Sequence, residues 1–75
     1  MNIDSSVSNI AIKVYGEIKS VPQNISILNL LELYKINKER VVIELNKTIL
    51  KKDQFKTIKL NENDFLEIVT FVGGG

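Results

Sequence analysis

The chain has 75 residues, 44% of them hydrophobic, and it contains neither cysteine nor histidine. A chain of this length forms one small domain that buries only roughly 60% of its unfolded surface, without disulfides or a zinc site to stabilise it. The missing thiol and imidazole groups also exclude the usual nucleophiles, general bases and soft-metal ligands. Ten basic and nine acidic side chains give a formal charge of +1, which is too balanced for a protein held to nucleic acid by phosphate contacts.

The N-terminal residues 1–9 are predicted to form a flexible lead, because polar residues separate apolar ones that are too sparse to pack. This stretch has neither the basic start nor the apolar block of a secretory signal peptide. No apolar run reaches the roughly 18 residues of a membrane-spanning helix. We therefore expect a soluble protein of the cytoplasm or, given the isoleucine, lysine and asparagine typical of AT-rich genomes, of a plastid stroma.

Two short strands are predicted at the start of the ordered domain. Apolar side chains alternate with less apolar ones over residues 10–15, a period of two that is typical of a half-buried strand. Gly16 interrupts this pattern, and extended character resumes over residues 18–21. These features predict a hairpin whose second strand ends at Pro22, because proline cannot donate a ladder hydrogen bond.

One amphipathic helix is predicted after this hairpin. Ser26 is suited to cap its N-terminus, since a serine hydroxyl accepts a hydrogen bond from a free backbone N–H of the first turn. Apolar residues then recur at i, i+3, i+4 and i+7: Ile27, Leu30, Leu31 and Tyr34. Leu28 and Leu33 are expected to widen this stripe. Asn37 is expected to end the helix, after about ten residues, in the left-handed conformation.

The second half of the chain is predicted to return to strands. Residues 41–45 show the period of two, and Asn46, which tolerates a positive φ, begins a tight turn into a short strand over residues 48–50. Phe55 is the only apolar residue in the polar stretch 51–56 and is expected to plug the edge of the core.

The last strand is predicted over residues 65–72, after an extended stretch at 57–60 and a polar turn at 61–64. Its alternation divides the side chains between two faces. One face carries Leu66 and Ile68, and the other carries Phe65, Glu67 and Val69.

The predicted order of strand, strand, helix and three further strands favours an α+β protein of the β-grasp type. In this fold a mixed sheet of four to five strands surrounds one helix, and the first and last strands lie parallel in the middle. The domain is expected to span residues 10–72, with a flexible glycine tail at residues 73–75.

The tail is the first feature that points to a function. Gly73, Gly74 and Gly75 have no side chains and lose much entropy when ordered, so folding does not require them. The four residues from Val72 onward reach roughly 13 Å when extended at about 3.3–3.6 Å each. A tail without Cβ atoms is suited to thread a narrow channel of a partner, and the α-carboxylate of Gly75 is its reactive group.

Several motifs accompany the tail in a defined order. Residues 41–47 form a strand followed by an asparagine turn, and Phe55 stands before the next extended stretch. Residues 60–64 then read Leu-Asn-Glu-Asn-Asp, a strand follows, and Val72 precedes the terminal glycines. Over residues 10–75 this arrangement resembles the family of thiamine-pathway sulfur carrier proteins, which have a Leu-x-x-Gly-Asp turn. Asn63 replaces the turn glycine of that family and also tolerates the left-handed region.

The resemblance implies a carrier rather than an enzyme, without catalytic side chains, a metal site or a bound cofactor of its own. In such families a ubiquitin-activating-type adenylyltransferase uses ATP and magnesium to adenylate the terminal carboxylate, here that of Gly75. A persulfide sulfur donor then displaces AMP to leave a thiocarboxylate, and thiazole synthase takes this sulfur for the thiazole of thiamine. Adenylation supplies the leaving group that a carboxylate lacks.

Two alternatives share parts of this pattern. The small subunit of molybdopterin synthase has the same fold and glycine end, but it usually carries a proline-containing segment before the glycines, and residues 70–72 contain none. A β-grasp interaction module that never carries sulfur is the second alternative.

Partner docking is expected on the sheet face turned away from the helix. Phe65, Val69 and Phe71 lie on or next to the last strand, and exposed apolar side chains beside the tail would form a docking patch. The alternative is that Phe65 or Phe71 folds over the end of the core. A cluster of lysines is interpreted as a solvated edge that deters aggregation, or else as a surface for an acidic partner: Lys47, Lys51, Lys52, Lys56 and Lys59.

Overall fold

The computed structural model describes residues 8–71, so residues 1–7 of the predicted lead and the predicted tail at residues 73–75 lie outside it. The strands are β1 (Asn9–Val14), β2 (Glu17–Pro22), β3 (Val41–Leu45), β4 (Thr48–Ile49) and β5 (Phe65–Thr70). One α-helix, α1 (Ile27–Leu33), and two 3-10 turns, η2 (Lys38–Arg40) and η3 (Lys52–Gln54), complete the described part of the chain. The order of the elements is the predicted one.

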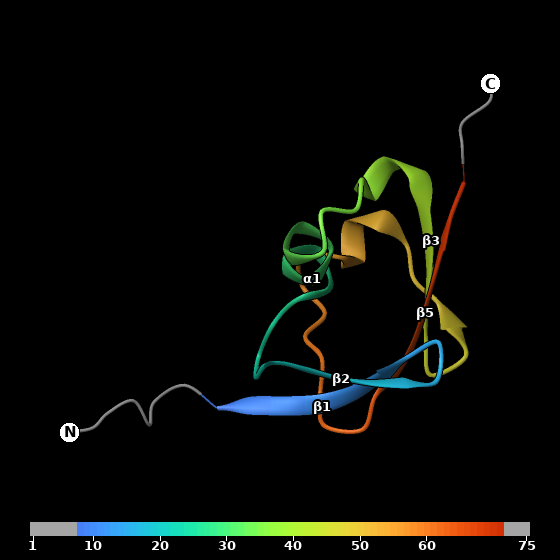
Figure 1. Cartoon of the computed structure of the whole chain (residues 1–75). Coiled ribbons are helices and arrows are strands. Elements are labelled where there is room, and N and C mark those ends of the chain that lie inside the picture. The colour runs from blue at the N-terminus through green and yellow to red at the C-terminus, as the bar shows by residue number, and fades with distance from the viewer. Residues whose placement is uncertain (1–7, 72–75) are drawn as a thin grey trace.

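The five strands form one mixed sheet in the order β2-β1-β5-β3-β4. The central pair, β1 and β5, is parallel, and the other neighbours are antiparallel. The β1–β2 hairpin crosses the direction of β3 and β5, and α1 lies in the angle between them (Figure 1). This is the predicted β-grasp arrangement.

The core fills the space between α1 and the concave face of the sheet. Its fully buried side chains come from the helix, from four segments of strand and from the loop before β5: Ile12, Val21, Ile27, Leu30, Leu31, Ile43, Leu60 and Leu66. Each such side chain stabilises the fold by about 1.5–3 kcal/mol through removal from water. Phe55 is also buried, and its carbonyl oxygen accepts a hydrogen bond of 2.8 Å from the Leu28 N–H, which confirms its role as a plug.

The helix begins as predicted at the Ser26 cap. The Ser26 hydroxyl oxygen accepts a hydrogen bond of 3.0 Å from the Asn29 N–H. Leu28 is half-buried and packs against the core, which confirms one of the two residues expected to widen the apolar stripe. Leu33, on the opposite flank, is 55% exposed, so that part of the prediction was wrong.

The end of the helix differs from the prediction. The helix has seven residues, and Lys35 (φ 60°) takes the left-handed conformation that was expected of Asn37. Ile36 then donates a hydrogen bond of 2.8 Å to the Leu31 carbonyl, which closes the helix, and its side chain turns back onto the core. Because the chain must reverse before Ile36, Asn37 comes too late. It caps η2 instead, where its Oδ1 accepts a hydrogen bond of 2.9 Å from the Glu39 N–H.

Left-handed residues make the tight turns. Tyr15 (φ 55°) and Gly16 (φ 81°) join β1 to β2, and Asn46 (φ 50°) and Lys47 (φ 72°) join β3 to β4. Two successive positive φ values match the right-handed twist of a hairpin. Asn63 (φ 70°) takes the place of the family's turn glycine, so the expectation that it tolerates this conformation is confirmed.

Several boundaries differ from those predicted, among them the end of β1 at Val14, the start of β2 at Glu17 and the end of β4 at Ile49. Strand β1 begins at Asn9, which pairs with Pro22, so the sheet starts one residue earlier than expected. Within residues 57–60 only Lys59 forms a β-bridge, to Ser26, and Thr57 lies in a turn. Strand β5 ends at Thr70 rather than residue 72.

Candidate functional site

Strand β5 divides its side chains between the core and the opposite surface, as its alternation predicts. Leu66 and Ile68 are 0% and 3% exposed. Phe65, Val69 and Phe71, the residues predicted for docking, are 41%, 55% and 48% exposed. Neither aromatic side chain folds over the end of the core, so the alternative placement is wrong. Their use in docking stays a prediction.

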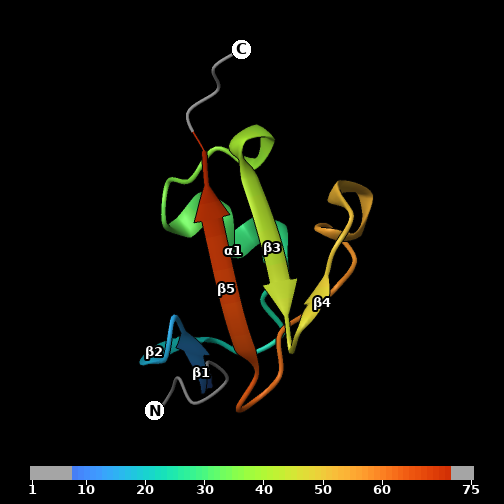
Figure 2. The same ribbon diagram turned by 90° about the vertical axis from the view of Figure 1, so that its right-hand side faces the viewer.

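Neighbouring strands extend this apolar surface. Val42 on β3 lies directly opposite Val69, and Ile49 on β4 lies opposite Glu44. On the hairpin, Ile18 shares the face of Lys13, the residue that pairs with Phe65. Figure 2 looks onto the part of this face formed by β3 and β5, with α1 behind it. The outer face is defined by its exposed apolar residues: Ile18, Val42, Ile49, Phe65, Val69 and Phe71.

Two carboxylates occupy the middle of the outer face. Glu44 on β3 and Glu67 on β5 are directly opposite each other in the antiparallel pairing. A hydrogen bond with the Glu67 side chain, removal from water and the Glu67 charge together raise the pKa of Glu44 above its usual 4.5, while Lys47 lowers it. The facing carboxylates therefore make the charged form of Glu44 less favourable than in an isolated side chain.

A hollow of about 490 Å³ lies beside this pair. Its lining includes both carboxylates, the ring of Phe65 and the turn between β3 and β4: Glu44, Asn46, Lys47, Phe65 and Glu67. The hollow therefore combines an apolar wall, negative charge and a lysine in one place.

Asn46 holds the wall of the hollow in position. Its Oδ1 accepts a hydrogen bond of 2.9 Å from the Phe65 N–H, and its Nδ2 donates one of 3.0 Å to Asp64 Oδ1. The Asn46 N–H also donates to the Phe65 carbonyl at 2.8 Å. Asp64 is buried, and its Oδ2 accepts 2.7 Å from the Asn61 N–H. Sequence reasoning assigned Asn46 only to a turn and missed this clamp.

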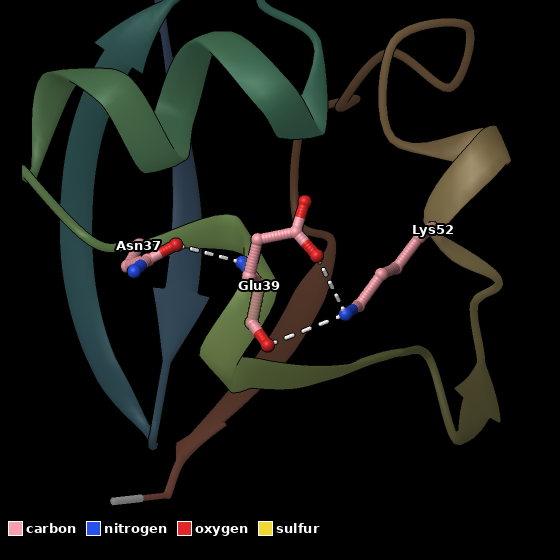
Figure 3. A network of polar contacts seen from close by, with 3 residues as sticks. All are labelled: Asn37, Glu39 and Lys52. Atoms are coloured by element: carbon pink, nitrogen blue, oxygen red, sulfur yellow. Dashed lines mark hydrogen bonds and ion pairs between the residues drawn. The ribbon is translucent and has the colours of Figure 1, made fainter. Parts of the chain in front are cut away.

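The C-terminal end of β5 is anchored by η2. The Phe71 N–H donates a hydrogen bond of 3.0 Å to the Arg40 carbonyl. Asn37 caps η2 on one side, and on the other Lys52 Nζ lies 3.2 Å from Glu39 Oε1 and 3.3 Å from its carbonyl oxygen (Figure 3). This network fixes the point from which the chain continues to Gly73, Gly74 and Gly75, which lie outside the described residues.

The lysines predicted to form a solvated edge are all exposed. Lys52 has a defined partner in Glu39. Within residues 8–71, no three or more acidic side chains are grouped so that they could hold a metal ion, and no helix is long and apolar enough to cross a membrane.

A model of the ThiS family matches residues 10–75. The chain belongs to the ThiS family. Members of this family are small non-catalytic carriers, so the protein is a ThiS-like sulfur carrier of thiamine biosynthesis and not an enzyme. This assignment favours the hypothesis of a thiamine-pathway carrier over a small subunit of molybdopterin synthase and over an interaction module that never carries sulfur.

Individual proteins similar to this chain accompany the family match. The chain is 43% identical over 68 residues to the uncharacterized protein ycf40 of Pyropia yezoensis, covering 91% of this chain and 96% of that protein. It is 40% identical over 50 residues to the sulfur carrier protein ThiS of Bacillus subtilis, covering 67% and 76%. The crystal structure of the thiamine biosynthesis protein ThiS from Geobacter metallireducens superimposes with a TM-score of 0.75 and 28% identity, over 88% of this chain and all of that one.

A fourth similarity joins this ThiS-like chain to a much larger protein. Over 62 residues the chain is 31% identical to a thiazole synthase of Paramagnetospirillum magneticum, covering 83% of this chain but 19% of the synthase. That synthase therefore contains a segment similar to this carrier.

Proposed function

We propose that the protein carries sulfur as a thiocarboxylate on Gly75 and delivers it to thiazole synthase. The observation that carries the proposal is the ThiS family match over residues 10–75, which includes the glycine tail. Since the chain contains no cysteine whose thiol could carry the sulfur, we assign the reactive group to the backbone carboxylate.

Activation proceeds in steps that an adenylyltransferase partner catalyses with ATP and magnesium. The Gly75 carboxylate attacks the α-phosphate of ATP and releases pyrophosphate. A persulfide donor then attacks the acyl carbon, AMP leaves, and an acyl persulfide forms. A thiol cleaves its S–S bond, so the thiocarboxylate remains on Gly75 while donor and thiol leave as a disulfide. The carrier itself contributes the tail and a docking surface.

The glycine tail explains how one small protein serves two enzymes in this proposal. Gly73 and Gly74 have no side chains that would obstruct a narrow channel, so the terminal carboxylate is able to enter a closed active site. The outer face, with Phe65, Val69 and Phe71, docks the partner and holds the tail at the channel. The carrier-like segment within a thiazole synthase supports thiazole synthase as one partner.

An intact-mass experiment tests this function. The protein is incubated with the adenylyltransferase of the same organism, ATP, magnesium and a persulfide donor, and its mass is expected to increase by one oxygen-to-sulfur exchange. A variant lacking Gly75 is expected to show no increase. A Gly74→Pro variant tests the channel, because its ring should block threading while the circular dichroism spectrum stays unchanged. An unmodified wild-type protein, or modification without Gly75, would refute the proposal.

A further inference from the structure

The pairing of Glu44 with Glu67 is unfavourable for the isolated protein. Like charges directly opposite on neighbouring strands destabilise a sheet. The ion pairs among the described residues join Lys19 to Glu17 and Lys52 to Glu39, and neither relieves the two carboxylates. Folding therefore offers no reason to place both negative charges at the centre of an apolar surface.

The groups around the pair leave one open side. Ile49 lies opposite Glu44 on β4, and Lys13 on β1 pairs with Phe65 at the other edge of the hollow. Lys47 lines the hollow and is exposed, so it offsets part of the negative charge from a flexible stem. The remaining side is the hollow itself, with the exposed ring of Phe65 as its wall.

An arginine side chain matches this hollow better than other cations. A guanidinium group is planar, donates to two carboxylates at once and stacks on an aromatic ring. It is also weakly hydrated, so it tolerates the apolar wall formed by Phe65 better than an ammonium group does. A lysine would meet the charge but would leave the ring wall unused.

We propose that thiazole synthase docks on the outer face by inserting an arginine side chain between Phe65 and the carboxylates of Glu44 and Glu67. This inference rests on the proposed function, because it takes thiazole synthase as the partner. The apolar residues of the outer face surround the contact and exclude water from it.

The binding test uses a double variant and a matched control. Glu44→Gln with Glu67→Gln keeps the shape of the hollow and removes its charge. Glu32→Gln with Asp53→Asn makes the same change in net charge at exposed positions away from the outer face. By calorimetry with the thiazole synthase of the same organism, we expect the first variant to lose affinity at least about tenfold and the control to lose less than about twofold. Equal affinity of both variants would overturn the proposal.

The identity of the cation is tested by chemical protection. Phenylglyoxal modifies exposed arginines, and peptide mass spectrometry identifies the modified sites on thiazole synthase. We expect one arginine of the synthase to be protected by the wild-type carrier but not by the Glu44→Gln, Glu67→Gln variant. Protection of a lysine against acetylation, with every arginine still reactive, would contradict the assignment of the cation to arginine. If the double variant lost affinity only for the adenylyltransferase, the assignment of thiazole synthase as the partner would be wrong.

The proposed sulfur transfer and the proposed arginine contact would be refuted by different results. If the wild-type protein never acquires sulfur at Gly75, the proposed function is wrong. If it acquires sulfur and binds thiazole synthase, but the double variant binds equally well, only the arginine contact is wrong.

Discussion

The two faces of β5 differ in what their side chains do. Leu66 and Ile68 are buried against the core, whereas the outward residues Phe65, Glu67 and Val69 are exposed between two neighbouring strands. The inward set is explained by folding alone. The outward set combines apolar side chains with Glu67, whose carboxylate faces that of Glu44 on β3, an arrangement that a stable monomer does not require. Because successive side chains of a strand point to opposite faces, β5 thus separates the residues that stabilise the core from those proposed to bind a partner.

The strongest test of this separation removes an inward side chain. Leu66→Ala leaves a cavity beneath the sheet and is expected to lower the free energy of unfolding by about 2–5 kcal/mol, measured by urea denaturation. Its outward control, Val69→Ala, is expected to change that free energy by no more than about 0.5 kcal/mol. Equal losses in the two variants would mean that the faces are not separated.

The next largest effect is expected at Asn46, which joins the turn between β3 and β4 to the start of β5. Asn46→Ala removes the side-chain hydrogen bonds with Asp64 and with the Phe65 N–H. It also places alanine, which does not favour the left-handed region, at φ 50°. We expect a loss of about 1–3 kcal/mol in the free energy of unfolding. Asn46→Gly keeps the φ value accessible, so its smaller loss would isolate the hydrogen bonds; no loss in either variant would exclude the clamp.

A smaller effect is expected at the anchor of η2. Lys52→Met removes an exposed ion pair with Glu39, which is worth about 0.2–1 kcal/mol in such positions. Since the Arg40 carbonyl of η2 accepts the hydrogen bond from the Phe71 N–H, amide hydrogen exchange at Phe71 should also become faster. Lys51→Met serves as the control, because Lys51 is exposed and neighbours Lys52 along the chain. Unchanged exchange at Phe71 in Lys52→Met would contradict the anchoring role.

The smallest effect concerns the carboxylate pair and has a defined pH dependence. The pKa of Glu44 is raised in the folded protein, so the native state binds more protons than the unfolded one between pH 4.5 and that raised pKa. Stability is therefore lost as the pH rises through this window. Glu44→Gln should raise the Tm slightly at pH 7, and the difference should shrink as the pH falls towards 4.5. A Tm difference that does not depend on pH would show that the pair is not coupled.

Local patterns predicted which face each strand residue occupies, because the side-chain period of a strand is independent of its neighbours. The separation of Leu66 and Ile68 from Phe65 and Val69 followed from this alone. The facing of Glu44 and Glu67 did not, since it depends on the register between two strands that are distant in the sequence.

Tertiary contacts also explain the other differences. The helix ends at Leu33, and the chain reverses at Lys35, because Ile36 packs back on the core, a contact that asparagine's preference for the left-handed region does not reveal. The side chain of Asn46 has its partners in Asp64 and Phe65, which only the folded sheet brings near it. Val42 also belongs to the outer face. Its place there could have been predicted, because it alternates along β3 with Val41 and Ile43.

The most direct measurement is single-turnover sulfur discharge into thiazole synthase. Carrier protein with a preformed Gly75 thiocarboxylate, prepared by intein thiolysis, bypasses activation and isolates docking and transfer. The account predicts that a Val69→Ser, Phe71→Ser variant, with the Tm of the wild type, discharges its sulfur at least about tenfold more slowly at limiting synthase. An Ile68→Val variant, which is less stable but keeps the outer face, should discharge at the wild-type rate. Wild-type discharge by the outer-face variant would contradict the account.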